Sequence, residues 1–496
     1  MSPGPVGAPM GATAPPRTGL SADDRAQRVR FRRALTLMLL TLVLPGSAQV
    51  VAGSERSRRI TVRVWAVTII VVATAVLISL LALPVAAIAG VTPREFVLRA
   101  ATNTLLLAVL RWLLLVGAVG WAFLFVDAWR LGNPLTLHRH HRLTVVGVNA
   151  ALCLAVAVPM LFGAHVVAVT RDSLVALAGN GVASGAHDGR YNVLLIGGDQ
   201  GAGRWGMRAD SINVASIDAE TGKTLLISLP RNMQNFPFAE GSVMDEQFPQ
   251  GFDEPDVYLN GLTTWAADHQ QLFKGVDHPG VEATIQAVEG ITDLRINYWA
   301  MVNLEGFKGL VDAVGGVELN VRQPIPVGLP HEKTFHYIEP GKRVLDGHDT
   351  LWFARAREGS DDYSRMARQK CVMSAMLTQL SPRTVVTNLS DIAEAGSELV
   401  STDLPGKEMG RFIDLAMKAK SQKISTLSLV PPMINTADPD IELVHRKVAE
   451  AIDRVEGQAP ARRRGPATGT AVTGGSVGSL SGGYAANESE DLGAVC

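Results

Sequence analysis

Apolar residues are arranged in two different ways along the chain. Up to about residue 170 they form long runs flanked by arginines, and from about residue 190 they form short runs separated by turn residues. A membrane-spanning helix needs about 20 consecutive apolar residues, and three runs reach that length: 64–90, 102–125 and 143–169. The pattern therefore predicts N-terminal transmembrane helices followed by a globular domain.

The first apolar run, 34–53, is shorter and is interrupted by Pro45-Gly46-Ser47. It either crosses the membrane or enters and leaves on the same side as a re-entrant segment. Cytoplasmic loops carry an excess of Lys and Arg, so we expect the basic segments 25–33, 56–59 and 130–142 in the cytoplasm. If 34–53 is re-entrant and the next three runs cross fully, all three basic segments lie in the cytoplasm. Residues from about 171 onward then lie outside the cytoplasm.

The short runs beyond residue 190 predict an α/β domain. Strands are expected at 192–196, 211–218, 224–229, 298–302, 317–321 and 424–430. Helices are expected at 255–272, 278–290, 304–314, 363–380, 387–400, 407–419 and 441–456, and 343–355 is expected to begin as a turn and become helical. The chain then divides into a disordered cytoplasmic N-terminus (1–33), a membrane anchor (34–170), a linker (171–189), an extracytoplasmic domain (190–457) and a disordered tail (458–496).

Composition narrows the classes of function. Hydrophobic residues make up 47% of the 496 residues and charged residues only 19%, which agrees with membrane segments. The formal net charge of -1 provides no basic field for nucleic acid. Because Cys153, Cys371 and Cys496 lie far apart, we expect neither a disulfide framework nor a metal site built from them. The histidines between residues 331 and 348 also lack zinc-site spacing.

Candidate chemistry begins at the first strand of the domain. Asp199 follows that strand, and a Gly-rich loop leads to Arg208 and Asp210 just before the second strand. The turn at 218–223 is typical of a hairpin, so the second and third strands are expected to pair antiparallel, with Arg231 at the end of the third. Two carboxylates with arginines between them suit a divalent cation and a phosphate. The alternative is that both aspartates are turn or cap residues.

A second set of arginines follows further along the chain. Arg355 and Arg357 are two residues apart, and Arg365 and Arg368 lie on one side of the predicted helix at 363–380, with Gln369 next in sequence. Arginine binds phosphate oxygens through two parallel hydrogen bonds, so these side chains are candidates for an anion site. The alternative is a salt-bridged surface formed with the acidic residues Glu358, Asp361 and Asp362.

The chain contains no GxxxxGK[ST] or HExxH motif, and it has no GxSxG nucleophile elbow between a predicted strand and a predicted helix. Its motifs between about 190 and 380 resemble the LytR-CpsA-Psr family: YNVLLIGGDQ, RADSINVASID, LLISLPRN, MVNLEGFKGLVDAVGGVELNV, GKRVLDGHDTLWFARAR and DDYSRMARQK. The resemblance implies an α/β/α sandwich with a mixed central sheet and an apolar pocket for a polyprenyl chain. It also implies an enzyme that uses Mg2+ to transfer a glycopolymer, such as teichoic acid or arabinogalactan, from polyprenyl pyrophosphate onto peptidoglycan as a phosphodiester.

Residue by residue, the resemblance assigns the metal ligands to Asp199 and Asp210. It assigns the pyrophosphate-binding and catalytic arginines to Arg208, Arg231, Arg355 and Arg357, and the family's Arg-Gln pair to Arg368 and Gln369, beside which we also expect Arg365. Two positions depart from the family pattern, because Asn232 replaces an aspartate and Tyr258 replaces a lysine. Either change would weaken phosphate positioning or slow turnover.

Three functions from different classes follow from these residues. The favoured one is the phosphotransferase, in which a sugar hydroxyl of peptidoglycan attacks the sugar-linked phosphorus and one aspartate acts as the base. Its partners are the lipid-linked glycopolymer, peptidoglycan and membrane lipid, with no nucleic acid. The alternatives are a weakened lipid-glycan-binding scaffold, motivated by Asn232 and Tyr258, and a polyprenyl-pyrophosphate hydrolase that uses water as the acceptor.

Overall fold

The computed structural model describes residues 22–63, 66, 103–179, 181–199, 208–329, 331–356, 362–379, 400–420, 422, 424–457 and 496. The chain forms two compact units, one of residues 1–91 and 108–167 and one of residues 92–107 and 168–496. We take each unit by itself. The predicted span at 64–90, apart from residue 66, and most of the predicted tail at 458–496 lie outside the described residues.

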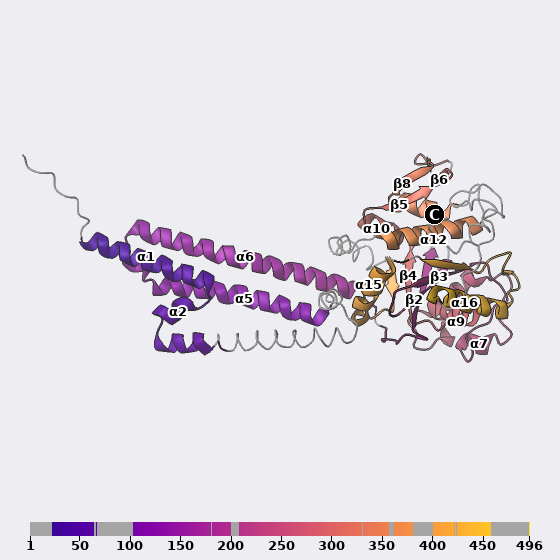
Figure 1. Ribbon diagram of the computed structural model, residues 1–496, viewed down its shortest axis with the longest axis horizontal. Coiled ribbons are helices and arrows are strands. Elements are labelled where there is room, and N and C mark those ends of the chain that lie inside the picture. Colours follow the sequence, from indigo (N-terminus) through magenta and orange to yellow (C-terminus); the bar gives the residue numbers. More distant parts are fainter. Residues whose placement is uncertain are drawn as a thin grey trace, which may run out of the picture. The chain divides into compact units, whose positions relative to one another are not determined.

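The first unit is helical (Figure 1). Its elements are α1 (Ala22–Val43), α2 (Ser47–Ala52), α5 (Thr104–Leu131), the short 3-10 helix η1 (Pro134–Thr136) and α6 (Arg139–Leu177). The first residues of α5 and the last residues of α6 belong to the second unit. Within the described ranges, two helical stretches are long and apolar enough to cross a membrane, Thr104–Thr136 and Arg139–Val175. They coincide with two of the three predicted spans, and this finding is consistent with membrane anchoring.

The apolar run at 34–53 is broken where its sequence predicts. Gly46 adopts a left-handed conformation with φ of 89° and separates α1 from α2. Both helices contribute to a small apolar core that includes Leu37, Met38 and Ala48. Side chains of α2 and α5 reinforce it, because Gln49 Nε2 donates to Leu124 O at 3.2 Å and Trp121 Nε1 donates to Thr41 O at 3.0 Å.

The structure differs from the prediction of a disordered N-terminus at residues 22–33. These residues belong to α1, which begins at Ala22. The segment is polar but rich in Arg, and it also contains Ala22, Ala26 and Gln27, all residue types of high helix propensity. It continues without a break into the apolar part of the same helix. Composition alone therefore places the boundary of the ordered region too late.

The second unit is built on a six-stranded sheet in the order β10-β3-β2-β1-β4-β9. Its strands are β1 (Arg190–Asp199), β2 (Arg208–Asp218), β3 (Thr224–Leu229), β4 (Tyr298–Asn303), β9 (Val400–Thr402) and β10 (Ser425–Ser428). β2 pairs antiparallel with β3, as the hairpin turn predicts, and also antiparallel with β1. β1 pairs parallel with β4, and β3 pairs parallel with β10. The predicted mixed sheet is confirmed.

Helices cover both faces of this sheet (Figure 1). One face packs its alternating apolar residues, such as Leu194, Val214 and Ile227, against α8 (Leu262–Asp268), α9 (Pro279–Thr292) and α16 (Ile441–Glu456). The other face packs Leu226 against α12 (Asp362–Gln379) and Tyr191 against α15 (Gly406–Lys420). The unit is therefore an α/β/α sandwich, as predicted.

Smaller elements complete the second unit. They are α7 (Val243–Gln247), η2 (Leu259–Gly261), η3 (Gln270–Leu272), α10 (Leu304–Ala313), β5 (Val317–Val321), β6 (Ile325–Val327), β7 (His336–Ile338), β8 (Gly341–Leu345) and α11 (Gly347–Arg355). β8 forms where a turn is predicted, since its largely exposed residues pair with β5 and acquire strand geometry from that partner. The helix predicted at 387–400 lies outside the described residues except for Val400, which begins β9.

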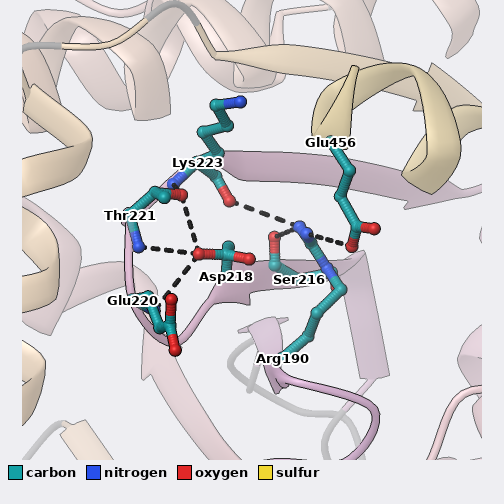
Figure 2. Close-up of polar contacts among 7 residues, drawn as sticks. All are labelled: Arg190, Ser216, Asp218, Glu220, Thr221, Lys223 and Glu456. Carbon is teal, nitrogen blue, oxygen red and sulfur yellow. Dashed lines mark hydrogen bonds and ion pairs between the residues drawn. The ribbon is translucent and has the colours of Figure 1, made fainter. Parts of the chain in front are cut away.

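A buried arginine fixes one end of the sheet (Figure 2). Arg190 donates to Ser216 Oγ and Ser216 O, both at 2.8 Å, and lies 3.2 Å from Glu456 at the end of α16. Beside it, Asp218 closes the hairpin turn by accepting from Thr221 N at 2.7 Å. Burial opposes the charged form of Asp218, but hydrogen bonds from Thr221 and Glu220 and the charge of Arg190 lower the pKa of this carboxyl. The candidate site lies at the opposite end of these strands.

Cys371 on α12 forms a disulfide bond with Cys496, with the two Cα atoms 5.4 Å apart. The prediction that the cysteines form no disulfide was therefore wrong. The two residues are separated by 125 positions, so no spacing motif indicates the pair. The fold brings Cys496 against the apolar cluster that includes Cys371 and Val372, and Cys153 is the free cysteine.

Candidate functional site

The site begins where β1 ends and β2 starts. Asp199 is opposite Arg208 in the ladder, and Gly198 is opposite Ala209, but Gly197 is opposite Ser211. Asp210 is thus the extra residue of a β-bulge, a feature that re-aims a side chain out of the regular strand alternation. Gly197 suits this close approach, since a Cβ there would lie 3.1 Å from the Cβ of Ser211. The Gly-rich loop at 200–207 lies outside the described residues.

Arg231 brings the end of β3 to this bulge. Its Nη1 donates to Asp210 Oδ1 at 2.6 Å, so the predicted approach of Asp210 and Arg231 is confirmed. The opposite edge of the same guanidinium faces Asp362, with Nε 2.9 Å from Oδ2 and Nη2 3.4 Å from Oδ1. Burial works against the charged form of Arg231, but Asp362 and Asp210 outweigh it and raise the pKa of Arg231.

The first turn of α12 supplies a second guanidinium. Arg365 Nη2 donates to Asp362 Oδ2 at 3.2 Å, and the Arg365 side chain is only 3% exposed. Two arginines from separate elements therefore converge on one carboxylate in a partly buried setting. A small pocket opens beside them, lined by Asp210, Ser211, Ile212, Asn213, Ser228, Leu229, Arg231, Arg365, Met366 and Gln369.

Arg368 lies elsewhere on α12. It is fully buried, and its Nε donates to Phe353 O at 2.7 Å while its Nη2 donates to Ala356 O. Gln369 Nε2 donates to Ala354 O at 3.3 Å, so both side chains of the Arg-Gln pair bind the backbone at the end of α11. This geometry gives Arg368 a structural task, which is to hold the segment that carries Arg355.

The remaining predicted residues lie around this centre or beyond the described ranges. Arg208 is exposed at the start of β2, and Arg355 is exposed at the end of α11, with its guanidinium 5.6 Å from the centre of the Trp352 ring. Arg357 lies outside the described residues, and Asp199 is described only by its place at the end of β1. The structure thus joins Asp210, Arg231, Arg365 and Gln369 directly in one pocket.

Asp362 is the site residue that the sequence does not single out. Its sequence context indicates only a helix cap or a surface ion-pair partner. The available signal is two consecutive aspartates, Asp361 and Asp362, immediately before a helix with two arginines, but an acidic pair at a helix start is ordinarily explained by the helix dipole. The contact with Arg231, 131 positions away, exists only in the folded chain.

Polar residues continue under the pocket across the sheet. Asn213 Nδ2 donates to Ser211 Oγ at 2.9 Å, and Ser228 Oγ donates to Asn213 Oδ1 at 2.7 Å. From α12, Lys370 Nζ donates to Ser428 Oγ at 2.8 Å, and burial lowers the pKa of Lys370 to about 7. The sandwich therefore has a polar layer on this part of its α12 face, where the pocket lies.

The predicted acidic ligands, Asp199 and Asp210, would supply only part of the coordination shell of a divalent cation. Asp199 and Asp210 come from adjacent strands at the same end of the sheet. Among the described residues no group of three or more His, Cys, Asp and Glu side chains could hold a metal. Mg2+ commonly binds proteins through one or two carboxylates and takes its other ligands from water and substrate phosphates. Carboxylate oxygens are ligands that Mg2+ accepts, and a magnesium ion shared with a phosphate ligand stays a prediction for these two aspartates.

The two departures from the family pattern lie beside Arg231. Asn260 N donates to Arg231 O, and Leu259 N donates to Met233 O, both at 3.0 Å. These hydrogen bonds place Tyr258 and Asn232 on two backbone segments that run next to each other. The two positions at which the resemblance implies an aspartate and a lysine therefore share one small region, where this chain has Asn232 and Tyr258.

A sequence model of the LytR_cpsA_psr family matches residues 168–445. The chain belongs to the LytR_cpsA_psr family. The family resemblance expected from the motifs is thereby confirmed, and the matched residues include the sheet and the pocket just described.

Several curated proteins are similar in sequence to this chain. A polyisoprenyl-teichoic acid–peptidoglycan teichoic acid transferase, TagU of Oceanobacillus iheyensis, is 29% identical over 216 residues, which are 43% of this chain and 58% of the relative. Biofilm regulatory protein A of Streptococcus mutans is 28% identical over 222 residues, which are 43% of this chain and 50% of that protein. TagV of Bacillus subtilis, named as a transferase of the same kind, is 25% identical over 244 residues, which are 48% of this chain and 56% of TagV. The chain thus spans little more than half the length of these curated relatives.

Solved structures are similar at lower identity. The crystal structure of Bacillus subtilis TagV is 22% identical, with 55% of this chain and 100% of TagV covered and a TM-score of 0.40. The structure of TagT bound to LIIa-WTA is 18% identical, with 56% of this chain and 96% of TagT covered and a TM-score of 0.38.

Proposed function

We propose that the protein is a membrane-anchored phosphotransferase that moves a glycopolymer from a polyprenyl-pyrophosphate carrier onto peptidoglycan. Membership of the LytR_cpsA_psr family and the transferase names of its relatives support this reaction class. The observation that carries the proposal is the convergence of Arg231 and Arg365, from two separate elements, on one partly buried anion position beside Asp210.

In this proposal the arginines bind the pyrophosphate. Arg231 and Arg365 bind it within the pocket, and the exposed Arg208 and Arg355 add positive charge beside it. We propose the same role for Arg357, which lies outside the described residues. Arg368 and Gln369 keep the end of α11 in place through their backbone hydrogen bonds. Asp199 and Asp210 would hold Mg2+, which when bound supplies positive charge that stabilises the phosphate oxygens.

The chemistry is a substitution at phosphorus. A sugar hydroxyl of peptidoglycan forms a new P–O bond to the phosphorus that carries the glycopolymer, and the P–O bond to the prenyl phosphate breaks. The prenyl phosphate leaves with the bonding electrons, and the hydroxyl proton passes to one of the two aspartates. Guanidinium groups preorganised in a partly buried pocket stabilise the charge that develops on the leaving phosphate.

The location of the reaction follows from the anchor. Peptidoglycan is outside the cytoplasm, so the proposal requires the second unit to face outward. The basic segments 25–33, 56–59 and 130–142 favour that orientation, with 34–53 re-entrant and three full spans. We therefore propose a multi-pass membrane protein with an extracytoplasmic catalytic unit.

The test is a transfer assay with the full chain in proteoliposomes. We expect a lipid-linked glycopolymer and peptidoglycan to yield glycan-phosphate attached to the sugar backbone, detected by mass spectrometry of the digested peptidoglycan. Arg355→Ala should slow transfer about 100-fold, the magnitude found when one charge-stabilising group is removed. Arg343→Ala, which removes another exposed arginine on β8, is the matched control and should keep normal transfer.

Two results would replace this proposal by its alternatives. Free glycan-phosphate without attachment to peptidoglycan would identify a hydrolase. Binding of the lipid-linked polymer without release of prenyl phosphate would identify a scaffold. Asn232 and Tyr258, the two departures from the family pattern, are the reason to consider that alternative. Full transfer activity in Arg355→Ala would contradict the assigned site itself.

A further inference from the structure

Asp362 accepts hydrogen bonds from both arginines of the pocket. Its Oδ2 lies 2.9 Å from Arg231 Nε and 3.2 Å from Arg365 Nη2, and its Oδ1 lies 3.4 Å from Arg231 Nη2. The carboxylate therefore takes a position in which two guanidinium groups surround one anion. The side chains of Arg231, Arg365 and Asp362 are 20%, 3% and 28% exposed, respectively. Solvent therefore screens this contact only in part.

The contact uses a particular edge of Arg231. A guanidinium binds a carboxylate or a phosphate in two-point fashion through Nε and one Nη, or through both Nη groups. In Arg231 the Nη1 group already donates to Asp210 at 2.6 Å, and the edge formed by Nε and Nη2 is directed at Asp362. A phosphate that is to bind Arg231 through two hydrogen bonds on this edge needs the place of the Asp362 carboxylate.

We propose that Asp362 is an internal competitor for the anion site, whose carboxylate occupies the position of a substrate phosphate between Arg231 and Arg365 and is displaced when the diphosphate binds. This inference rests on the proposed function, since it concerns how the same pocket accepts its pyrophosphate ligand. It gives Asp362 a role that neither helix capping nor a surface ion pair includes.

Competition of this kind has a consequence for the catalytic cycle. When the Asp362 carboxylate occupies the pocket, only the fraction of molecules with an open pocket can bind an anion. The apparent Kd equals the intrinsic Kd divided by that open fraction. The penalty applies equally to the diphosphate substrate and to the monophosphate product. A diphosphate retains further contacts with the arginines beside the pocket, whereas the monophosphate has fewer, so Asp362 favours release of the prenyl phosphate after transfer.

The experiment is a calorimetric titration of the full chain in detergent micelles with inorganic pyrophosphate, in buffer without divalent cations. The variants are Asp362→Asn, which keeps one acceptor oxygen, and Asp362→Ser, which keeps a helix-capping side chain. Both should bind pyrophosphate about tenfold more tightly than the wild type, the change expected if one molecule in ten is open. Glu450→Gln removes the same charge from an exposed pair with Lys447 and should leave the affinity unchanged.

The possible outcomes separate the two proposals. If the wild type binds pyrophosphate and both Asp362 variants bind it equally or more weakly, Asp362 positions the arginines and does not compete, and this inference fails alone. If neither wild type nor folded variants bind pyrophosphate, the proposed function fails together with the inference. Thermal unfolding of each variant verifies that it is folded, and tighter binding in either folded variant supports the competition.

Discussion

At the scale of single residues, the pKa values of two cations, the buried Lys370 and the partly buried Arg231, shift in opposite directions. The pKa of Arg231 is raised in spite of burial, because Asp362 and Asp210 outweigh desolvation. Lys370 is 1% exposed and donates to the neutral hydroxyl of Ser428, and desolvation lowers its pKa to about 7. An amine in that setting costs stability whenever the unfolded chain would hold a proton that the folded chain releases.

Replacing Lys370 should therefore change how stability depends on pH. The ordinary pKa of lysine, 10.5, applies to the unfolded chain, so wild-type stability should rise as the pH increases from about 7 to about 10.5. The penalty is fully present below pH 7. Lys370→Met should raise the melting temperature at pH 7 and lose most of this advantage near pH 10, with a change of at most about 4 kcal/mol between the two.

The measurement is thermal unfolding of the full chain followed by tryptophan fluorescence between pH 7 and pH 10. Lys342→Met is the control, because the Lys342 side chain is 79% exposed and its substitution should leave the pH dependence unchanged. A lower melting temperature for Lys370→Met at pH 7 would mean that the buried amine is net stabilising there.

At the scale of elements, α12 connects the site to the rest of the second unit. Its first turn supplies Asp362 and Arg365, its middle supplies Arg368 and Lys370, and Cys371 is disulfide-bonded to Cys496. Arg368 also fixes the end of α11, so one buried guanidinium joins the segment of Arg355 to the helix of Arg365. A change in the position of α12 would alter the contacts of Arg231 and the placement of Arg355 together.

Elements with a strong local pattern were predictable from the sequence. The apolar run of β3, the alternating pattern of β5 and the apolar stripe of α16 give the observed bounds, and the turn at 218–223 gives the β2–β3 hairpin. Because the hairpin places the start of β2 beside the end of β3, it also predicts that Asp210 and Arg231 meet. Local propensity and turn chemistry were sufficient for this part of the site.

Features that depend on distant pairing were not predictable. β8 owes its strand geometry to β5, and β6 pairs with β7 through only three residues each. Asp362 meets Arg231 across 131 positions, and Cys371 meets Cys496 across 125. Neither the hydrophobic period nor a motif carries that information, because the contact is formed by the packing of α12 on the sheet.

At the scale of the whole molecule, the proposal depends on which side of the membrane the second unit occupies. The described residues contain two stretches long enough to span, and the predicted span at 64–90 lies outside them apart from residue 66. An even or odd number of crossings places the second unit on different sides, so the account requires three full spans with 34–53 re-entrant.

A reporter fusion measures this directly. Alkaline phosphatase, which is active only outside the cytoplasm, should be active when fused after Glu456 and inactive when fused after Arg63. The positive-inside rule gives this result because Arg63 follows the basic cluster at 56–59. Activity of the fusion after Arg63 and none after Glu456 would place the second unit in the cytoplasm, away from peptidoglycan.

The most direct test of the central claim is a structure of the full chain with a prenyl diphosphate and Mn2+, whose anomalous scattering locates the cation. We predict a metal peak between Asp199 and Asp210, phosphate oxygens within hydrogen-bond distance of Arg231 and Arg365, and Asp362 displaced from Arg231. Phosphates bound away from this pocket, with the Arg231–Asp362 pair intact and no metal at the two aspartates, would contradict the account.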